Sequence, residues 1–364
     1  MIDLADYRIR GRKDIVSYRN IVLFGAGNYL RDSIETFGRK NIIAVLDNDS
    51  KKWGLEIEGV KVQDPHEFFQ KSGTDDFAVV LSTSGYQYEI AESLVKNNWI
   101  GMDRIFSLCP DYQEQKMYQY RDILNNMDMI EKVYDLLEDE ESKTYFINSL
   151  ITRITHQPLY LKSNKNIQQS YCYSGENMIC PLAGDYIMDC GAYIGDTAQI
   201  FASRIGNKGK IYCFEPFEGN YERLVQWIET SGIEIAQAYQ LAVGNQDENR
   251  VVSANNQVSM RANIRTCENE KNEVYVRKID SLYGDIVKKV DFIKMDVEGE
   301  EVNALKGAKR TIASCKPRMM ISAYHETKHL WEIPLLIKEI MPEYKIYIGH
   351  QPHVSFEPEI YVKC

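Results

Sequence analysis

The segment from Tyr186 to Thr197, YIMDCGAYIGDT, contains the residues of this chain that point most directly to chemistry. Its pattern predicts a buried strand, Tyr186 to Cys190, followed by a glycine turn and the start of a helix. Asp189, Gly191 and Gly195 stand as D-x-G-x-x-x-G, which differs from the G-x-G-x-x-G of dinucleotide-binding turns. Such glycines allow the backbone to turn sharply and to approach a ligand closely, and the helix start offers free N–H groups.

A second strand is expected from Lys210 to Phe214, and it ends in Glu215 and Pro216. An acid at the tip of this strand can accept hydrogen bonds from two ribose hydroxyls. A glycine turn without the pyrophosphate spacing, followed by such an acid, suits a nucleoside that carries no phosphate. S-adenosylmethionine is the obvious candidate, and an ordinary strand–turn–helix packed with small residues is the structural alternative.

A third segment, DFIKMDVEGEE from Asp291 to Glu301, reads as a buried strand with charged residues at its exit. These residues are Lys294, Asp296, Glu298, Glu300 and Glu301. In an open parallel α/β sheet, ligands lie beyond the carboxyl ends of the strands. Acids crowded at such an end are costly unless they bind a ligand, a metal or a proton, so this exit is a candidate site.

Together the three segments resemble the FkbM-type methyltransferase family. The resemblance covers about the last two-thirds of the chain and is carried, in order, by DCGAYIGDT, YCFEPFEGNYERL, LAVGN, KIDSL, DFIKMDVEGEE and ISAYHETKHLWEIPLLIKEI. It implies an α/β fold with a class I methyltransferase Rossmann-like sheet of seven strands, and S-adenosylmethionine as the cofactor. We expect three parts: a small Rossmann-like α/β domain at 1–110, a helical connector at 111–180 and the catalytic domain at 181–364.

The resemblance and the strand positions assign cofactor-binding residues at three strand ends. These are Asp189, Gly191, Ala192, Tyr193 and Gly195 under the methionine portion, Glu215 and Pro216 at the ribose, and Ala242 and Val243 beside the adenine. Ala242 and Val243 are expected to end the third strand. Asn220 is expected to cap the following helix, with support of the ribose as the alternative.

Catalytic roles are expected for residues that face the transferred methyl group. Asp296 ends the fourth strand and would orient an acceptor hydroxyl or help to bind a cation. His325 follows the fifth strand, Arg318 to Tyr324, and a histidine near its unperturbed pKa is a suitable base for a sugar hydroxyl. A histidine hydrogen-bonded at the start of a loop is the alternative reading. His350 and His353 lie in the last hairpin and would line the acceptor pocket.

No set of metal ligands is assigned. Neither histidine pair, His325 with His329 or His350 with His353, has the spacing of a known metal site in this context. Some sugar methyltransferases of neighbouring families use magnesium held by acids, so a divalent cation bound by Asp296 and a second acid stays an open alternative.

The first hundred residues alternate strand, helix and strand, which indicates a small parallel sheet. The segments FGAGNYL, LDNDSKKWG and IEGVKVQDP resemble the N-terminal domain of bacterial sugar-modifying enzymes, including acyltransferases in which it holds a nucleotide-sugar. The GAGNYL turn lacks the third glycine of the dinucleotide fingerprint, so complete NAD binding is not expected. A ligand-binding module and a scaffolding one both remain open.

Apolar residues at helical spacing between Ile123 and Leu137, and again between Phe146 and Ile154, predict a helical connector. We expect this connector to pack either on the catalytic domain or on a partner subunit. Packing on a partner subunit would make the protein a homo-oligomer. The segment Asn164 to Cys172 leads into the catalytic sheet and is expected to lie over the mouth of the active site.

The composition narrows the class of partner. The 364 residues carry a net charge of −10 and no long basic run, which argues against a nucleic-acid substrate. No apolar run has the length of a membrane span and the N-terminus lacks a signal peptide, so we expect a cytoplasmic protein. The eight cysteines form no C-x-x-C pair, which argues against a disulfide framework and a structural zinc.

The sequence therefore predicts an S-adenosylmethionine-dependent O-methyltransferase. The expected acceptor is a hydroxyl of a saccharide or nucleotide-sugar, in the biosynthesis of a surface glycan or a secondary metabolite. One alternative is a nucleotide-sugar oxidoreductase that uses the N-terminal domain, which the missing third glycine disfavours. The other is a non-catalytic nucleotide-binding scaffold, against which the intact DCGAYIGD and EPF elements argue.

Overall fold

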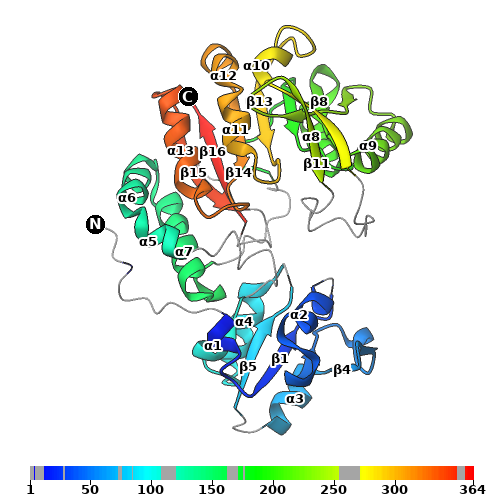
Figure 1. Ribbon diagram of the computed structural model, residues 1–364, viewed down its shortest axis with the longest axis vertical. Helices are drawn as coiled ribbons and strands as arrows, with labels where there is room; N and C mark the ends of the chain where they lie inside the picture. The colour runs from blue at the N-terminus through cyan, green and yellow to red at the C-terminus, as the bar shows by residue number, and fades with distance from the viewer. Residues whose placement is uncertain are drawn as a thin grey trace.

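In the computed structural model the chain forms two α/β units joined by a helical segment (Figure 1). The structure describes residue 4 and residues 12–27, 29–72, 76–83, 85–107, 120–161, 171–174, 177–253, 271–350 and 357–364. Within these ranges, none of the helices has the length and the hydropathy that a bilayer crossing needs.

The N-terminal unit is a six-stranded sheet with the order β3-β4-β2-β1-β5-β6. Its strands are β1 (Asn20–Phe24), β2 (Ile42–Leu46), β3 (Glu56–Ile57), β4 (Val60–Gln63), β5 (Phe77–Leu81) and β6 (Ile105–Phe106). Its helices are α1 (Arg12–Ile15), α2 (Leu30–Phe37), α3 (Pro65–Ser72) and α4 (Gln87–Lys96). Alternate residues of β1 face opposite sides, so Leu23 packs in the cluster with α2 and Phe24 in the cluster with α3 and α4.

Asp47, at the tip of β2, stands where a dinucleotide-binding domain keeps its ribose acid. Here its side chain accepts hydrogen bonds from Ala26 N at 2.8 Å, from Asp49 N at 2.8 Å and from Lys52 Nζ at 2.9 Å. Burial by itself raises the pKa of Asp47, but Lys52 and the two N–H groups overcome this effect and lower it. Asp47 thus stabilises the glycine turn of this unit through its hydrogen bond with Ala26 N.

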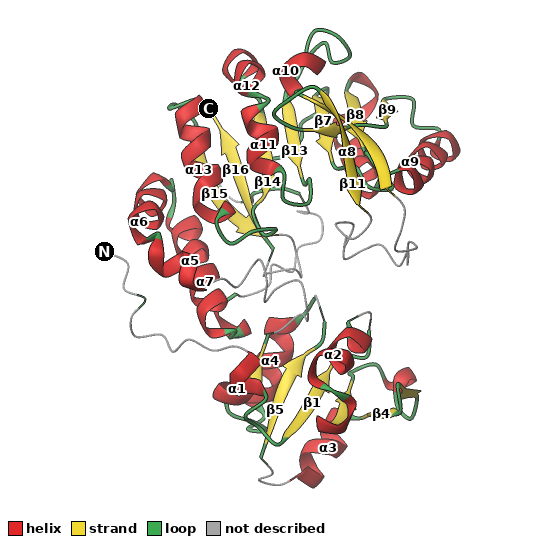
Figure 2. Cartoon of the chain, viewed as in Figure 1, coloured by secondary structure: helices red, strands yellow, loops and turns green. Residues whose placement is uncertain are grey.

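The connecting helices are α5 (Tyr120–Asn125), α6 (Met127–Leu136) and α7 (Glu140–Thr155). Figure 2 shows them beside β15 and α13 of the second unit. Ile130 and Phe146 belong to the same buried cluster as Ile346 of that sheet. Asp139 caps α7 by accepting a hydrogen bond from Ser142 N at 2.8 Å, which explains why a run of acids precedes this helix. The connector therefore packs on the sheet of the second unit.

The second unit contains a seven-stranded sheet with the order β15-β16-β14-β13-β7-β8-β9. Its strands are β7 (Tyr186–Cys190), β8 (Lys210–Phe214), β9 (Ala236–Tyr239), β13 (Phe292–Met295), β14 (Arg318–Ser322), β15 (Lys345–His350) and β16 (Pro358–Lys363). Its helices are α8 (Asp196–Ile205), α9 (Glu218–Ser231), α10 (Ile279–Leu282), α11 (Glu301–Lys306), α12 (Lys309–Cys315) and α13 (His329–Ile340). The strands from β14 to β9 are parallel, and β16 runs antiparallel to β14 and β15. The predicted α/β class and seven-stranded sheet are confirmed.

One expected strand end is wrong. Ala242 and Val243 do not end the third strand, because β9 stops at Tyr239 and a tight turn follows, in which Leu241 N donates to Tyr239 O at 3.0 Å. Ala242–Val243 is instead strand β10 of a separate three-stranded sheet with β12 (Lys271–Arg277) and β11 (Glu248–Ser253). The carboxyl end of the third strand is therefore Tyr239.

We expect Asp47→Ala to destabilise the N-terminal unit by about 1–3 kcal/mol, because two backbone N–H groups and the Lys52 ammonium would lose their acceptor. Urea unfolding followed by tryptophan fluorescence measures the change, since Trp53 donates to the carbonyl of Asp47 at 2.7 Å. Asp49→Ala is the matched control, because Asp49 accepts from Lys51 N on an exposed turn. Equal stability of the two variants would contradict the structural role of Asp47.

Candidate active site

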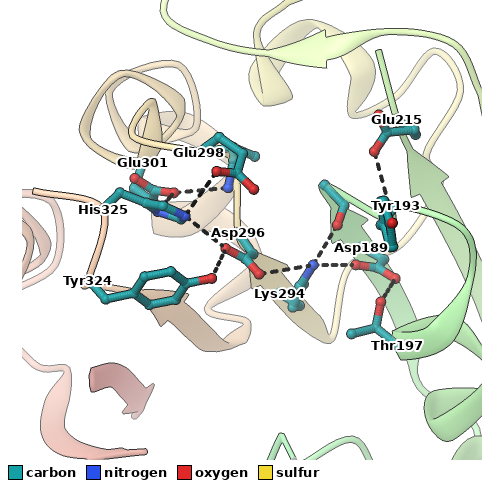
Figure 3. A network of polar contacts seen from close by, with 12 residues as sticks. Asp189, Tyr193, Thr197, Glu215, Lys294, Asp296, Glu298, Glu301, Tyr324 and His325 are labelled. Carbon is teal, nitrogen blue, oxygen red and sulfur yellow. Dashed lines mark hydrogen bonds and ion pairs between the residues drawn. The ribbon is translucent and has the colours of Figure 1, made fainter. Parts of the chain in front are cut away.

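The carboxyl ends of four neighbouring parallel strands converge on one network of polar side chains (Figure 3). Asp189 lies in β7, Glu215 follows β8, Asp296 follows β13 and His325 lies three residues beyond β14. Since β14, β13, β7 and β8 are adjacent and parallel, these side chains reach the same edge of the sheet.

Lys294 is the buried cation at the centre of the network, and only 2% of its side chain is exposed. Its Nζ donates to the carbonyl of Gly191 at 2.6 Å and lies 3.3 Å from Asp189 Oδ1 and 4.0 Å from Asp296 Oδ2. Burial opposes its charge, but the carboxylates of Asp189 and then Asp296 raise the pKa of Lys294 above its ordinary value. Asp189 is held from its other oxygen by the hydroxyl of Thr197 at 2.8 Å.

The glycine turn lies directly against the residues that follow β13. Gly191 has φ of +80°, and a Cβ atom there would lie 1.8 Å from the carbonyl oxygen of Asp296. Gly195 has φ of +96°, and a Cβ atom there would lie 2.5 Å from Trp227 of α9. Both positions therefore need glycine, for the backbone conformation and for the close approach.

Glu215 is buried and accepts three hydrogen bonds. Its Oε2 accepts from Tyr193 N at 3.0 Å, and its Oε1 accepts from Phe217 N at 3.1 Å and from Asn220 Nδ2 at 3.3 Å. Burial raises the pKa of Glu215 to about 7, although these donors favour the ionised form. The expected cap at Asn220 is wrong, because α9 already begins at Glu218, and Asn220 instead supports the carboxylate.

Asp296 is partly exposed, with 29% of its side chain accessible, and the neighbouring Glu298 is 47% exposed. Asp296 Oδ1 accepts from the hydroxyl of Tyr324 at 3.0 Å and lies 3.5 Å from His325 Nε2. With Lys294 on its other oxygen, Asp296 is a partly exposed carboxylate between two basic side chains, as Figure 3 shows. Such a carboxylate can accept a hydrogen bond from a hydroxyl that reaches the edge of the sheet.

His325 is buried among acids. Its Nδ1 lies 2.9 Å from Glu301 Oε1, and its Nε2 lies 3.5 Å from Asp296 and 3.6 Å from Glu298 Oε2. Burial lowers its pKa, but Glu301 foremost, then Glu298 and Asp296, raise the pKa of His325 to about 10. His325 is therefore charged at neutral pH, and the expectation of a histidine near its ordinary pKa is wrong.

Glu301 is the fully buried partner that sequence reasoning left without a role. Besides His325 it accepts from Val297 N at 2.9 Å and lies 3.3 Å from His329 Nδ1. Burial raises its pKa, but His325 and the other donors outweigh this and lower the pKa of Glu301 to about 2. The sequence contained a signal for this role. Glu301 begins a helix that follows the tight Val297-Glu298-Gly299 turn, and an acid at that position can point back toward the turn.

Other expected site residues lie elsewhere or outside the described residues. His350 stacks its ring on Tyr145 of α7, with 4.9 Å between the ring centroids. Beside Glu215 the third-strand residue is Tyr239, whose carbonyl accepts from Glu215 N at 3.2 Å. His353 and most of the expected segment over the site, 164–170, lie outside the described residues.

Ligand atoms of Asp296, Glu301 and His325 lie within 4.8 Å of one another, so the residues could be considered as a cation site. The chemistry of these donors does not fit magnesium. His325 offers a nitrogen ligand, whereas magnesium prefers an octahedral shell of oxygen ligands. The short Glu301–His325 ion pair already balances the buried charge, so we assign no magnesium here.

Comparisons with known proteins bear on the second unit and on the fold. Residues 189–345 match the family model of the methyltransferase FkbM domain. The crystal structure of methyltransferase FkbM from Methylobacillus flagellatus KT matches with a TM-score of 0.71 and 20% identity, over 98% of this chain and 95% of that chain. No match was found among curated protein sequences.

Two further structures match half of this chain with low TM-scores. Aeropyrum pernix fibrillarin with natively bound S-adenosyl-L-methionine has a TM-score of 0.34 and 14% identity, over 67% of its chain. A SAM-dependent O-methyltransferase from Thermotoga maritima has a TM-score of 0.33 and 14% identity, over 60% of its chain.

The matched range begins at Asp189 and includes Glu215, Asp296 and His325, so it contains the network described above. The strand order and the Methylobacillus structure agree on the fold of a class I methyltransferase. Residues 189–345 therefore match a methyltransferase FkbM domain, and the chain has the fold of a class I methyltransferase.

Proposed function

We propose that this protein transfers a methyl group from S-adenosylmethionine to a hydroxyl of a saccharide or nucleotide-sugar. One observation carries the proposal: the glycine turn at Gly191 lies in contact with the backbone of Asp296. A cofactor bound over that turn would present its methyl group next to a partly exposed carboxylate. The methyl chemistry rests on the family match, and the cofactor placement and the acceptor are our inference.

The residues present fit the cofactor. Glu215 is a buried acceptor at the tip of the second strand, the place of a ribose-binding acid. Its three donors come from the chain itself, and Tyr193 N is the one that belongs to the glycine turn. Asp189 is fully buried behind Lys294, so we assign it to holding the turn rather than to touching the cofactor directly.

The acceptor chemistry is assigned to Asp296. S-adenosylmethionine supplies an electrophilic methyl carbon on a positively charged sulfur. The hydroxyl of the acceptor becomes strongly acidic as its oxygen gains the methyl group, so a carboxylate in hydrogen-bond contact suffices to take the proton. His325, held charged by Glu301, and Tyr324 keep Asp296 in one orientation. His325 is then a positioning residue, because a protonated imidazole accepts no proton.

The saccharide class is supported by two features. The N-terminal sequence resembles that of sugar-modifying enzymes, and the hydroxyl oxygen of Tyr324, whose proton is donated to Asp296, can accept a hydrogen bond from a neighbouring sugar hydroxyl. Incubation with labelled S-adenosylmethionine and a panel of nucleotide-sugars and glycans tests the proposal. Label transferred only to proteins or to non-sugar metabolites would contradict the acceptor class.

Affinity for S-adenosylhomocysteine should depend on pH through Glu215. With a pKa of about 7 in the free protein, Glu215 is mostly protonated at pH 6, and a protonated acid is a poorer acceptor for two hydroxyls. Calorimetry should therefore give a dissociation constant about tenfold higher at pH 6 than at pH 8. Glu215→Gln should bind more weakly at pH 8 and lose this pH dependence, whereas Glu218→Gln, on the exposed first turn of α9, should behave as wild type. A pH-independent wild-type affinity would remove Glu215 from the ribose site.

Asp296→Asn should reduce turnover by about 10²–10⁴-fold, the usual contribution of a proton-accepting group. Its affinity for S-adenosylhomocysteine should stay close to that of wild type, because Asp296 is assigned to the acceptor. Glu300→Gln is the matched control on the same turn, since Glu300 bonds to Asn303 and has no role in the proposed chemistry. Steady-state rates with the acceptor found in the screen measure this change. Full turnover of Asp296→Asn would contradict the role of Asp296 as the proton acceptor.

A further inference from the structure

Cys172 and Cys180 are brought together by a short antiparallel bridge just before the catalytic sheet. Tyr173 N donates to Ile179 O at 3.0 Å, and Ile179 N donates to Tyr173 O at 3.1 Å. Tyr173 and Ile179 thus form a hydrogen-bonded pair of an antiparallel ladder. The next residues outward, Cys172 and Cys180, are therefore directly opposed as a non-hydrogen-bonded pair. In such a pair the Cα atoms lie about 4.5 Å apart and both side chains point to the same face.

This placement suits a disulfide. Disulfides span Cα separations of about 4.4–6.8 Å, so opposed cysteines at this kind of position can be joined without moving the backbone. Each of the two thiols shifts the pKa of the other, which agrees with side chains that lie next to each other. Cys172 is partly exposed and Cys180 is buried, so the pair is open to a small oxidant from one side.

The surroundings of the pair favour a thiolate. The hydrogen bond from Cys172, followed by the charges of Arg204 and Arg318, lowers the pKa of Cys180 to about 7 against the effect of burial and of Asp185. Arg318 is fixed there, because it also donates to the carbonyl of Cys180 and to Asp185 Oδ2, the latter at 2.6 Å. The thiolate is the nucleophile in thiol oxidation.

We propose that Cys172 and Cys180 form a redox pair that a peroxide converts to a disulfide. The Cys180 thiolate attacks the peroxide, the O–O bond breaks, and a sulfenic acid and water form. The sulfur of Cys172 then attacks the sulfenic sulfur, and the S–O bond breaks with release of a second water. Two thiols and one hydrogen peroxide thus give one disulfide and two waters, and a dithiol reductant reverses the reaction.

The bond would form next to the candidate active site. Tyr171, adjacent to Cys172, packs edge-on against Phe201 of α8 at 5.8 Å between centroids, and α8 is the helix that follows the glycine turn. Tyr173 packs against Tyr347 and Tyr361 of the sheet. A disulfide would therefore fix a bridge that already contacts both α8 and the sheet. The inference does not depend on the proposed methyl transfer.

The test uses the full-length protein, reduced and then treated with one equivalent of hydrogen peroxide. After alkylation of the remaining thiols, peptide mass mapping should find residues 172 and 180 linked, with the loss of two hydrogen atoms. The free thiol count should fall from eight to six per chain and return to eight with dithiothreitol. The oxidised protein should melt roughly 3–8 °C higher than the reduced one.

Matched variants make the result specific. Cys172→Ser and Cys180→Ser should each abolish the intramolecular link, whereas Cys315→Ser and Cys364→Ser should retain it, because those cysteines lie elsewhere in the chain. The mapping on wild-type protein decides the case even where a serine variant fails to fold. The proposal is overturned if both thiols remain open to alkylation while other cysteines are oxidised, or if either forms its bond with a different cysteine.

Discussion

The buried ammonium of Lys294 is the interaction on which the candidate site depends. An unpaired charge at this depth would be strongly destabilising, and here Asp189, the carbonyl of Gly191 and Asp296 surround it. Two of these partners belong to β7 and its turn, and Asp296 follows β13. Lys294 thus ties the glycine turn to the exit of the neighbouring strand, and the absence of a side chain at Gly191 allows them to touch. Replacing Lys294 by an apolar residue would remove the cation that stands between Asp189 and Asp296.

A second buried ion pair, Glu301 with His325, stands on the far side of Asp296. Each partner shifts the pKa of the other in the direction that keeps both charged. Because both partners are buried, the pair is a fixed part of the interior, and the partly exposed acids beside it are Asp296 and Glu298. One carboxylate, Asp296, is therefore held between two cations, and its backbone lies against the glycine turn.

Much of this arrangement follows from the sequence. Parallel strands bring their carboxyl ends to one edge, so Asp189, Glu215, Asp296 and His325 could be placed together before any coordinates were known. The charge state of His325 could not, because it depends on Glu301, which lies 24 residues earlier and turns inward only through the tight V-E-G turn. The separate strand β10 was missed for a similar reason. Its residues are as apolar as the end of a core strand, and the strand with which they pair, β12, lies about thirty residues later in the chain. The pairing of Cys172 with Cys180 needed the bridge between Tyr173 and Ile179, which leaves no periodic signal over so few residues.

The central claim is that the glycine turn and Asp296 form the two halves of one methyl-transfer site. The most direct measurement is a crystal structure of the protein with S-adenosylhomocysteine bound. We expect the ligand over the turn at 191–195, with its ribose hydroxyls on Glu215 and its sulfur toward Asp296. A ligand bound in the N-terminal unit, or over the turn with its sulfur directed away from Asp296, would contradict the central claim.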